Sequence, residues 1–85
     1  MDPYKIIKHP LSTEKSIRLM ESQNQMIFVV DMKADKQMVK KAIEEILKAK
    51  VDSVKTYVQN GEKRAYVKFS NERPAIDIAT QLGLM

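Results

Sequence analysis

Residues 51–69 read Val-Asp-Ser-Val-Lys-Thr-Tyr-Val-Gln-Asn-Gly-Glu-Lys-Arg-Ala-Tyr-Val-Lys-Phe. Asn60-Gly61 separates two runs in which apolar and polar residues alternate, and this dipeptide is typical of the two-residue turn of a β-hairpin. The stretch therefore predicts two antiparallel strands joined at Asn60 and Gly61. The register that follows pairs Ser53 with Lys68, Val54 with Val67, Lys55 with Tyr66, Thr56 with Ala65 and Tyr57 with Arg64.

The predicted register gives the hairpin two faces of opposite character. One face, which can be buried, carries Val54, Thr56, Val58, Ala65, Val67 and Phe69. The other, called the basic face below, carries Lys55, Tyr57, Arg64, Tyr66 and Lys68. A slip by one residue would move lysines into the core, so the pattern specifies the register strongly.

The basic face has two interpretations from the residues alone. Lysine and arginine attract phosphates, and tyrosine rings stack on bases or riboses, so the face is typical of a nucleic-acid contact. Charged and tyrosine side chains also keep an ordinary exposed sheet soluble. Both interpretations stay open at this point.

Length and composition bound the class of protein. The chain has 85 residues, enough for one small domain over residues 1–85. It holds 15 Lys and Arg against 11 Asp and Glu, a net charge of +4 that permits a nucleic-acid partner without establishing one. There is no cysteine, no apolar signal region at the N-terminus, and no apolar run near the length of a membrane span. We expect a soluble cytoplasmic protein that does not insert into a membrane.

The first part of the chain predicts a strand and a helix. Residues 4–8 read as a short strand that stops at His9-Pro10, because proline cannot donate a hydrogen bond to a strand ladder. Ser12 or Thr13 can then cap a helix that continues to about Ser22.

The remaining elements follow from hydrophobic spacing. After a connector at residues 22–25, the apolar residues 26–30 predict a central strand buried on both faces. Asp35 caps a helix, and a second helix starts near Pro74 and ends at Gly83. The buried faces of these helices carry Met38, Val39, Ala42, Ile43, Ile46 and Leu47, and Ala75, Ile78, Ala79 and Leu82. The order β-α-β-α-β-β-α predicts an α+β fold with a small antiparallel sheet packed with helices.

Catalytic chemistry has little support in the sequence. His9 is the only histidine and stands before a proline at a predicted strand end. Glu44 and Glu45 are neighbours on a helix, so their side chains diverge and cannot act as a pair. The two glycines do not form a phosphate-binding loop, and no carboxylates stand at metal-ligand spacing. We expect no enzyme activity, no cofactor and no metal.

Three stretches together resemble one family, the large-subunit ribosomal proteins of the L-twenty-three family. The stretches are Ile7-x-x-Pro10-x-x-Thr13-Glu14-Lys15, then Val51-Asp52-Ser53-Val54-Lys55-Thr56 with Gly61-Glu62-Lys63-Arg64-Ala65-Tyr66-Val67, and finally Ala75-x-Asp77-Ile78-Ala79-x-x-Leu82-Gly83. They cover most of the chain in the family's order.

The resemblance implies a structural constituent of the large ribosomal subunit that binds its rRNA near the polypeptide exit tunnel. It also implies neighbouring ribosomal proteins as partners, and docking of the signal recognition particle and other nascent-chain factors. By this resemblance Thr13 and Lys15 lie near rRNA. We expect the basic face to lie on the rRNA, with Lys63 near the hairpin turn adding charge. Glu14 matches the exposed acidic residue used for factor docking, although a negative charge there also suits the helix dipole.

The chain departs from some members of the family. Bacterial members have a long insertion between the hairpin strands, where this chain has only Asn60-Gly61, and the basic N-terminal extension of eukaryotic members is not seen. We therefore expect an archaeal-type member. Lys55 stands where many members have asparagine. The alternative is a small α+β protein–protein interaction or regulatory module without RNA binding, which would use Glu14 and the first helix.

Overall fold

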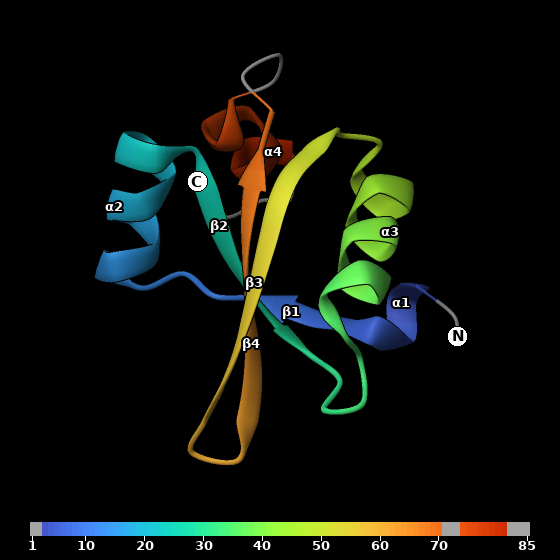
Figure 1. Ribbon diagram of the computed structural model, residues 1–85. Helices are drawn as coiled ribbons and strands as arrows, with labels where there is room; N and C mark the ends of the chain where they lie inside the picture. The colour runs from blue at the N-terminus through green and yellow to red at the C-terminus, as the bar shows by residue number, and fades with distance from the viewer. Residues whose placement is uncertain (1–2, 71–73, 82–85) are drawn as a thin grey trace.

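The computed structural model describes residues 3–70 and 74–81. Its elements are α1 (Pro3–Ile6), β1 (Ile7–Pro10), α2 (Glu14–Gln23), β2 (Gln25–Val30), α3 (Lys36–Leu47), β3 (Val51–Gln59), β4 (Glu62–Phe69) and α4 (Ala75–Gln81). The strands form a four-stranded antiparallel sheet in the order β1-β2-β4-β3 (Figure 1). The predicted α+β class and the order β-α-β-α-β-β-α are confirmed, with the short helix α1 added before the first strand.

The β3–β4 hairpin has the predicted register. All five predicted pairs face each other, from Ser53 with Lys68 to Tyr57 with Arg64. Asn60 has φ of 54° and Gly61 has φ of 74°, so both turn residues are left-handed. Two consecutive positive φ values characterise the type I′ turn, whose twist matches that of the flanking strands. The Asn-Gly pair therefore fixes the register that the alternating pattern requires.

Burial of the apolar hairpin face differs from the prediction at one end. Ala65, Val67 and Phe69 on β4 are buried, and Val54 and Thr56 on β3 are half-buried. Val58 was predicted on the buried face and is instead 65% exposed. Val58 lies on an edge strand next to the turn, and Figure 1 shows this end of the hairpin extending away from the helices. Lys63 pairs with Val58 there, and none of the described helices covers this end of the face.

β2 is the central strand that the sequence predicts. It pairs with β1 on one side and with β4 on the other, and residues 26–30 are all buried. Met26, Phe28 and Val30 belong to the main hydrophobic core, which α3 also lines. Ile27 and Val29 are buried on the opposite face of the sheet.

The start of the chain corrects the predicted strand at residues 4–8. Residues 3–6 form the helical turn α1, and the strand begins at Ile7 and includes His9 and Pro10. His9 lies opposite Val29, and Pro10 lies opposite Phe28. β1 is at the edge of the sheet, and an edge strand tolerates a proline because one of its sides has no neighbouring strand to receive an N–H.

The longer helices begin at their predicted caps. Thr13 caps α2, and the Asp35 side chain accepts a hydrogen bond of 2.8 Å from Met38 N at the start of α3. The predicted connector at residues 22–25 shortens to Asn24, because α2 continues to Gln23 and β2 begins at Gln25. The predicted buried faces of α3 and α4 pack in the core or against it as far as they are described. The predicted Leu82 and the helix end at Gly83 lie outside the described residues.

The helices lie on both sides of the sheet. Figure 1 shows α3 and α1 on one side and α2 on the other, near β2. α4 packs near the end of β4, and its Ala75, Ile78 and Ala79 join the main core with Met20 of α2. α2 lies on the side of the sheet that carries the basic face, so this helix and the hairpin together shape that surface.

Candidate nucleic-acid interface

The sheet presents the five residues of the basic face on one side. Lys55 and Tyr57 come from β3, and Arg64, Tyr66 and Lys68 come from β4, at alternate positions of paired strands. The same face continues across β2, where Tyr66 lies opposite Ile27 and Arg64 lies opposite Val29. The polar side chains of the hairpin therefore border the buried side chains of Ile27 and Val29 on the central strand.

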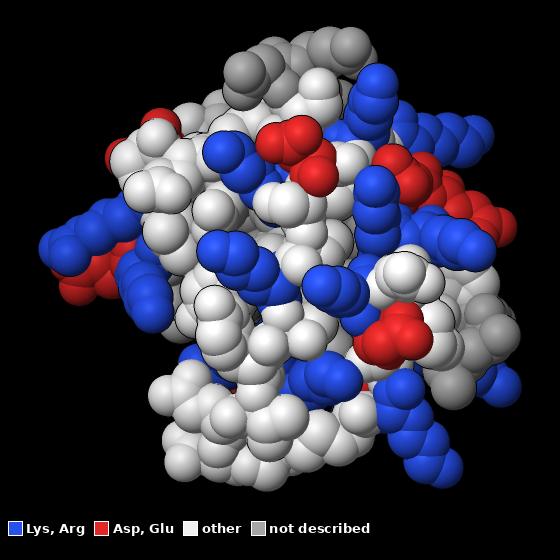
Figure 2. Space-filling model, viewed as in Figure 1, with Lys and Arg blue, Asp and Glu red and all other residues white. Residues whose placement is uncertain are grey.

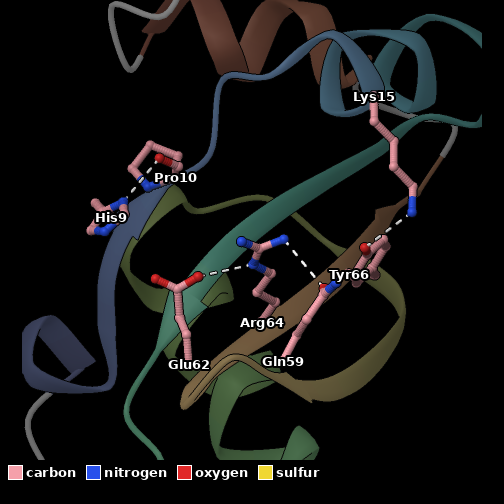
Figure 3. Close-up of polar contacts among 7 residues, drawn as sticks. All are labelled: His9, Pro10, Lys15, Gln59, Glu62, Arg64 and Tyr66. Atoms are coloured by element: carbon pink, nitrogen blue, oxygen red, sulfur yellow. Dashed lines mark hydrogen bonds and ion pairs between the residues drawn. The ribbon is translucent and has the colours of Figure 1, made fainter.

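Tyr66 lies at the centre of this surface and contacts two other predicted residues. The Tyr57 and Tyr66 ring centroids are 5.3 Å apart, with an interplanar angle of 85°, an edge-to-face pair. Lys15 reaches over from α2, with its Nζ 5.5 Å from the Tyr66 ring centroid and 3.5 Å from the Tyr66 hydroxyl (Figure 3). The distance to the ring is within the range of a cation–π contact. The fold thus brings Lys15 to the basic face from a position 51 residues earlier in the chain.

A groove of about 480 Å³ lies between α2 and the hairpin. Its lining residues come from four elements and are Lys15, Gln25, Lys55, Tyr57, Val58, Gln59 and Tyr66. Two are cationic and two are aromatic, and among the described residues that line the groove none is acidic. A surface of this composition suits an anionic ligand that has a flat ring.

Arg64 is held by neighbours on its own hairpin. Its Nε donates to the Glu62 carboxylate at 2.9 Å, and one terminal nitrogen lies 3.4 Å from Gln59 Oε1 (Figure 3). The side chains of Arg64 and Glu62 are 31% and 36% exposed, so solvent weakens this ion pair. Arg64 remains a cation on the basic face, with one acidic neighbour that an RNA phosphate would have to compete with.

Four predicted RNA-binding residues do not line the groove, namely Thr13, Lys63, Arg64 and Lys68. Lys68 lines a separate hollow beside the end of α2, together with Asn24 and Pro74. Lys63 comes directly before Arg64 in β4, and successive side chains of a strand point to opposite faces. Lys63 therefore lies on the face opposite Arg64, near the turn, where it pairs with Val58. The structure therefore gathers Lys15, Lys55, Tyr57 and Tyr66 and leaves Lys63, Arg64 and Lys68 as positive charges outside the groove lining.

Thr13 and Ser16 form the start of α2. The Thr13 hydroxyl accepts from Ser16 N at 3.2 Å, while the buried Ser16 Oγ accepts from Thr13 N at 2.7 Å and donates to Thr13 O at 2.8 Å. This reciprocal arrangement satisfies backbone groups that a helix start leaves without partners. Thr13 stands two residues before Lys15, so this cap defines the start of the helix from which Lys15 reaches Tyr66.

Glu14 is exposed on the first turn of α2. Its carboxylate pairs with Arg18 one turn later at 2.5 Å, and the two side chains are 80% and 75% exposed. At this exposure the pair adds little to stability and leaves both groups reachable from solvent.

The distribution of charge does not by itself select one binding surface. Figure 2 shows Lys and Arg side chains spread over the visible side of the molecule, with acidic groups among them. In residues 3–70 and 74–81 no cluster of His, Asp and Glu could hold a metal ion. None of the helices in these described ranges is long and apolar enough to cross a membrane. The groove is distinguished by its combination of cations and aromatic rings.

Sequence reasoning missed three residues that line the groove and both ion pairs described above. Gln25 enters the groove because β2 lies between α2 and the hairpin, and Val58 and Gln59 enter where β3 approaches its turn. Glu62 and Arg64 are two positions apart in β4, so their side chains lie on the same face of the strand. This spacing could have revealed their ion pair. No local pattern shows where α2 lies on the sheet.

A model of a known protein family matches most of the chain. The family model described as ribosomal protein L23 matches residues 5–80, which includes α2, the hairpin and most of α4. That family consists of structural proteins of the large ribosomal subunit and is not a family of enzymes. Membership makes the chain a ribosome-bound component of translation in the cytoplasm, with partners inside the ribosome. The chain belongs to the ribosomal protein L23 family.

Proposed function

We propose that this ribosomal protein binds large-subunit rRNA through the basic face and the adjoining start of α2. The observation that carries the proposal is the meeting of Lys15, Lys55, Tyr57 and Tyr66 at one groove without an acidic lining residue. Thr13, Arg64 and Lys68 extend this surface beyond the groove, and Lys63 adds positive charge on the opposite face of β4 near the turn. The whole of residues 1–85 acts as one rRNA-binding unit.

The mechanism is positioning without chemistry. Lysine and arginine contact phosphates, while Tyr57 and Tyr66 stack on bases or hydrogen-bond to riboses. Phosphate contacts carry little sequence information, so selectivity comes from the folded shape of the rRNA. If about five phosphates are neutralised, the logarithm of the binding constant falls with the logarithm of salt concentration at a slope of about −3.5 to −4.5.

The location proposed within the subunit is beside the polypeptide exit tunnel. Family membership supports this location, where the chain would help to form a docking site for the signal recognition particle and other nascent-chain factors. Glu14 is the proposed docking residue, and its 80% exposure leaves it accessible. The two-residue turn at Asn60 and Gly61 supports the archaeal type, because it lacks the insertion of bacterial members.

The test of rRNA binding uses charge reversal at two positions of the basic face. The double variant Arg64→Glu and Lys68→Glu should lose affinity for large-subunit rRNA at low salt and show a shallower salt slope. The matched control is Lys40→Glu with Lys41→Glu, the same charge change at exposed positions of α3 on the other side of the sheet. Equal losses from both pairs, or a wild-type slope near zero, would contradict the proposed interface.

The test of the location is association with ribosomal subunits. Tagged protein in lysate should sediment with the large subunit alone and stay bound through washes of moderate salt. Recovery only in the soluble fraction would contradict the proposed binding. For factor docking, Glu14→Gln should weaken binding of the signal recognition particle to ribosomes, whereas Glu21→Gln, also exposed on α2, should not.

A further inference from the structure

We propose that the groove between α2 and the hairpin holds a single nucleotide whose base is unstacked from the RNA, with the base against Tyr57 and its phosphates on Lys15 and Lys55. This inference rests on the rRNA binding proposed above and names the RNA element that the site takes. It commits to a bulged or single-stranded nucleotide and not to the outer surface of an RNA helix.

The first argument is the difference in exposure between the rings of Tyr57 and Tyr66. Tyr66 is half-buried, its ring contacts Tyr57 edge-to-face, and the Lys15 ammonium lies near its face. Tyr57 is 53% exposed, so the open aromatic surface of the groove belongs mainly to Tyr57. Tyr66 supports Tyr57 from the neighbouring strand, which gives a base a preorganised ring to stack on.

The second argument is the placement of charge. Lys15 enters from α2 and Lys55 from β3, so across the sheet the two cations stand on opposite sides of Tyr66. A nucleotide within an RNA chain has a phosphate on each side of its ribose, and two separated cations match that arrangement. The described lining contributes no carboxylate that would repel these phosphates.

The third argument is the presence of amide groups. Gln25 and Gln59 line the groove from β2 and β3. An amide side chain offers both hydrogen-bond donors and an acceptor, which suits the edge of any of the four bases. Gln59 Oε1 also lies 3.4 Å from an Arg64 terminal nitrogen, and this contact steadies the amide beside the groove.

The outer surface of an RNA helix does not fit this groove of the protein. In an A-form helix the bases are stacked inside, and the accessible groups are phosphates, ribose hydroxyls and the edges in the shallow groove. The lysines could contact that helix, but Tyr57 and the amides would have no base to receive. The volume of about 480 Å³ is within the range of about 300–1,000 Å³ that holds small ligands, which is enough for one nucleotide.

The experiment compares wild-type protein with Tyr57→Leu and Tyr57→Phe on transcribed large-subunit rRNA. Leucine keeps the apolar volume and removes the ring, whereas phenylalanine keeps the ring and removes only the hydroxyl. Reagents that modify the pairing edges of all four bases report the state of each base, and hydroxyl-radical cleavage reports the protected backbone. Thermal unfolding of each variant checks that it folds, which the exposed position of Tyr57 on an edge strand favours.

We expect wild-type protein and Tyr57→Phe to protect one unpaired base that Tyr57→Leu leaves reactive. Tyr57→Leu should bind roughly 5- to 150-fold more weakly, the range for loss of one base–aromatic stack, while the salt slope and the backbone footprint stay the same. A backbone footprint with identical base reactivity in wild type and Tyr57→Leu would overturn the inference and leave the proposed rRNA binding intact. No footprint from the wild-type protein would overturn both.

A second variant keeps the test decisive if Tyr57→Leu unfolds. Gln59→Glu puts a carboxylate into the groove at an exposed position, so it should weaken rRNA binding several-fold and expose the same base. Gln37→Glu makes the same change at an exposed position of α3 and should leave the base protected. Equal behaviour of the two variants would overturn the inference.

Discussion

Asn24 Oδ1 accepts a hydrogen bond of 2.6 Å from the backbone N–H of Ala75, which is 51 residues later in the chain. The side-chain nitrogen of the same Asn24 lies 3.1 Å from Phe69 O and 3.3 Å from Ser70 O. Asn24 thereby connects the end of α2, the end of β4 and the start of α4. It holds this position in the left-handed conformation, with φ of 56°, which asparagine adopts more readily than most residues.

Replacing Asn24 with alanine should therefore destabilise the protein. The variant loses hydrogen bonds at a half-buried site and strains the left-handed backbone, a combined cost of about 2 kcal/mol or more. Urea unfolding measures the loss. Asn24→Gly separates the two causes because glycine accepts the conformation and lacks the side chain. If the glycine variant is as stable as wild type, the side-chain hydrogen bonds contribute nothing.

Lys48 offers a stabilising change at the end of α3. It is exposed and left-handed, with φ of 51° and ψ of 38°, a conformation that costs an L-residue about 1–2 kcal/mol. Lys48→Gly should be more stable than Lys48→Ala by about 1 kcal/mol, because both variants lose the same charge and only glycine relieves the strain. Thermal or urea unfolding of the two variants makes the comparison, and equal stabilities would refute it.

Thr13 should act on RNA binding through the start of α2. Thr13→Ala removes the hydroxyl that accepts from Ser16 N and should cost about 1 kcal/mol of stability. Thr13→Ser keeps an oxygen at the same place and should retain both the stability and the rRNA affinity. Unfolding and filter-binding assays measure the two properties. A serine variant that folds normally but binds rRNA poorly would show that the threonine methyl group is needed at the interface.

Removing the carboxylate beside Arg64 should strengthen RNA binding. In the wild-type protein Arg64 Nε donates to the Glu62 carboxylate at 2.9 Å. Glu62→Gln weakens this contact and removes a negative charge that repels phosphates. We expect a several-fold higher affinity and a salt slope steeper by about 0.7–0.9 if Arg64 gains one phosphate. Stability should change by less than about 1 kcal/mol, as for other partly exposed ion pairs.

The control for this prediction is Glu45→Gln. It makes the same change of charge at an exposed position of α3, which lies on the opposite side of the sheet. Filter binding over a range of salt concentrations compares the two variants with wild type. If both raise the affinity equally, the effect comes from net charge and not from the release of Arg64.

Local rules predicted the hairpin and α3 well. Asn60-Gly61 leaves little choice of turn, and the alternation on both strands admits only one register without burying lysines. The cap at Asp35 and the apolar spacing of α3 agree with each other and with the structure. Where two independent local signals coincided, the prediction was confirmed.

The errors and omissions lie where tertiary position decides. Pro10 stands inside β1 because that strand is at the sheet edge. Val58 is exposed because none of the described helices covers the end of the hairpin. Asn24 looked like part of a polar connector, although its side chain reaches α4. The contact of Lys15 with Tyr66 depends on which face of the sheet α2 covers, and residue spacing along the chain does not encode that choice.

The strand order has a consequence for how the molecule is made. β2 pairs with β4 from Gln25 with Lys68 to Val30 with Lys63, so its second neighbour is synthesised long after β2 itself. Until then one side of an apolar strand has no partner, while β3 and β4 can pair with each other through a short loop. We expect a chain truncated after Gly61 to aggregate in a light-scattering assay, whereas a chain that includes Phe69 stays dispersed. During synthesis the strand at the centre of the finished sheet is therefore the most vulnerable part of the chain, and the late-made hairpin is what protects it.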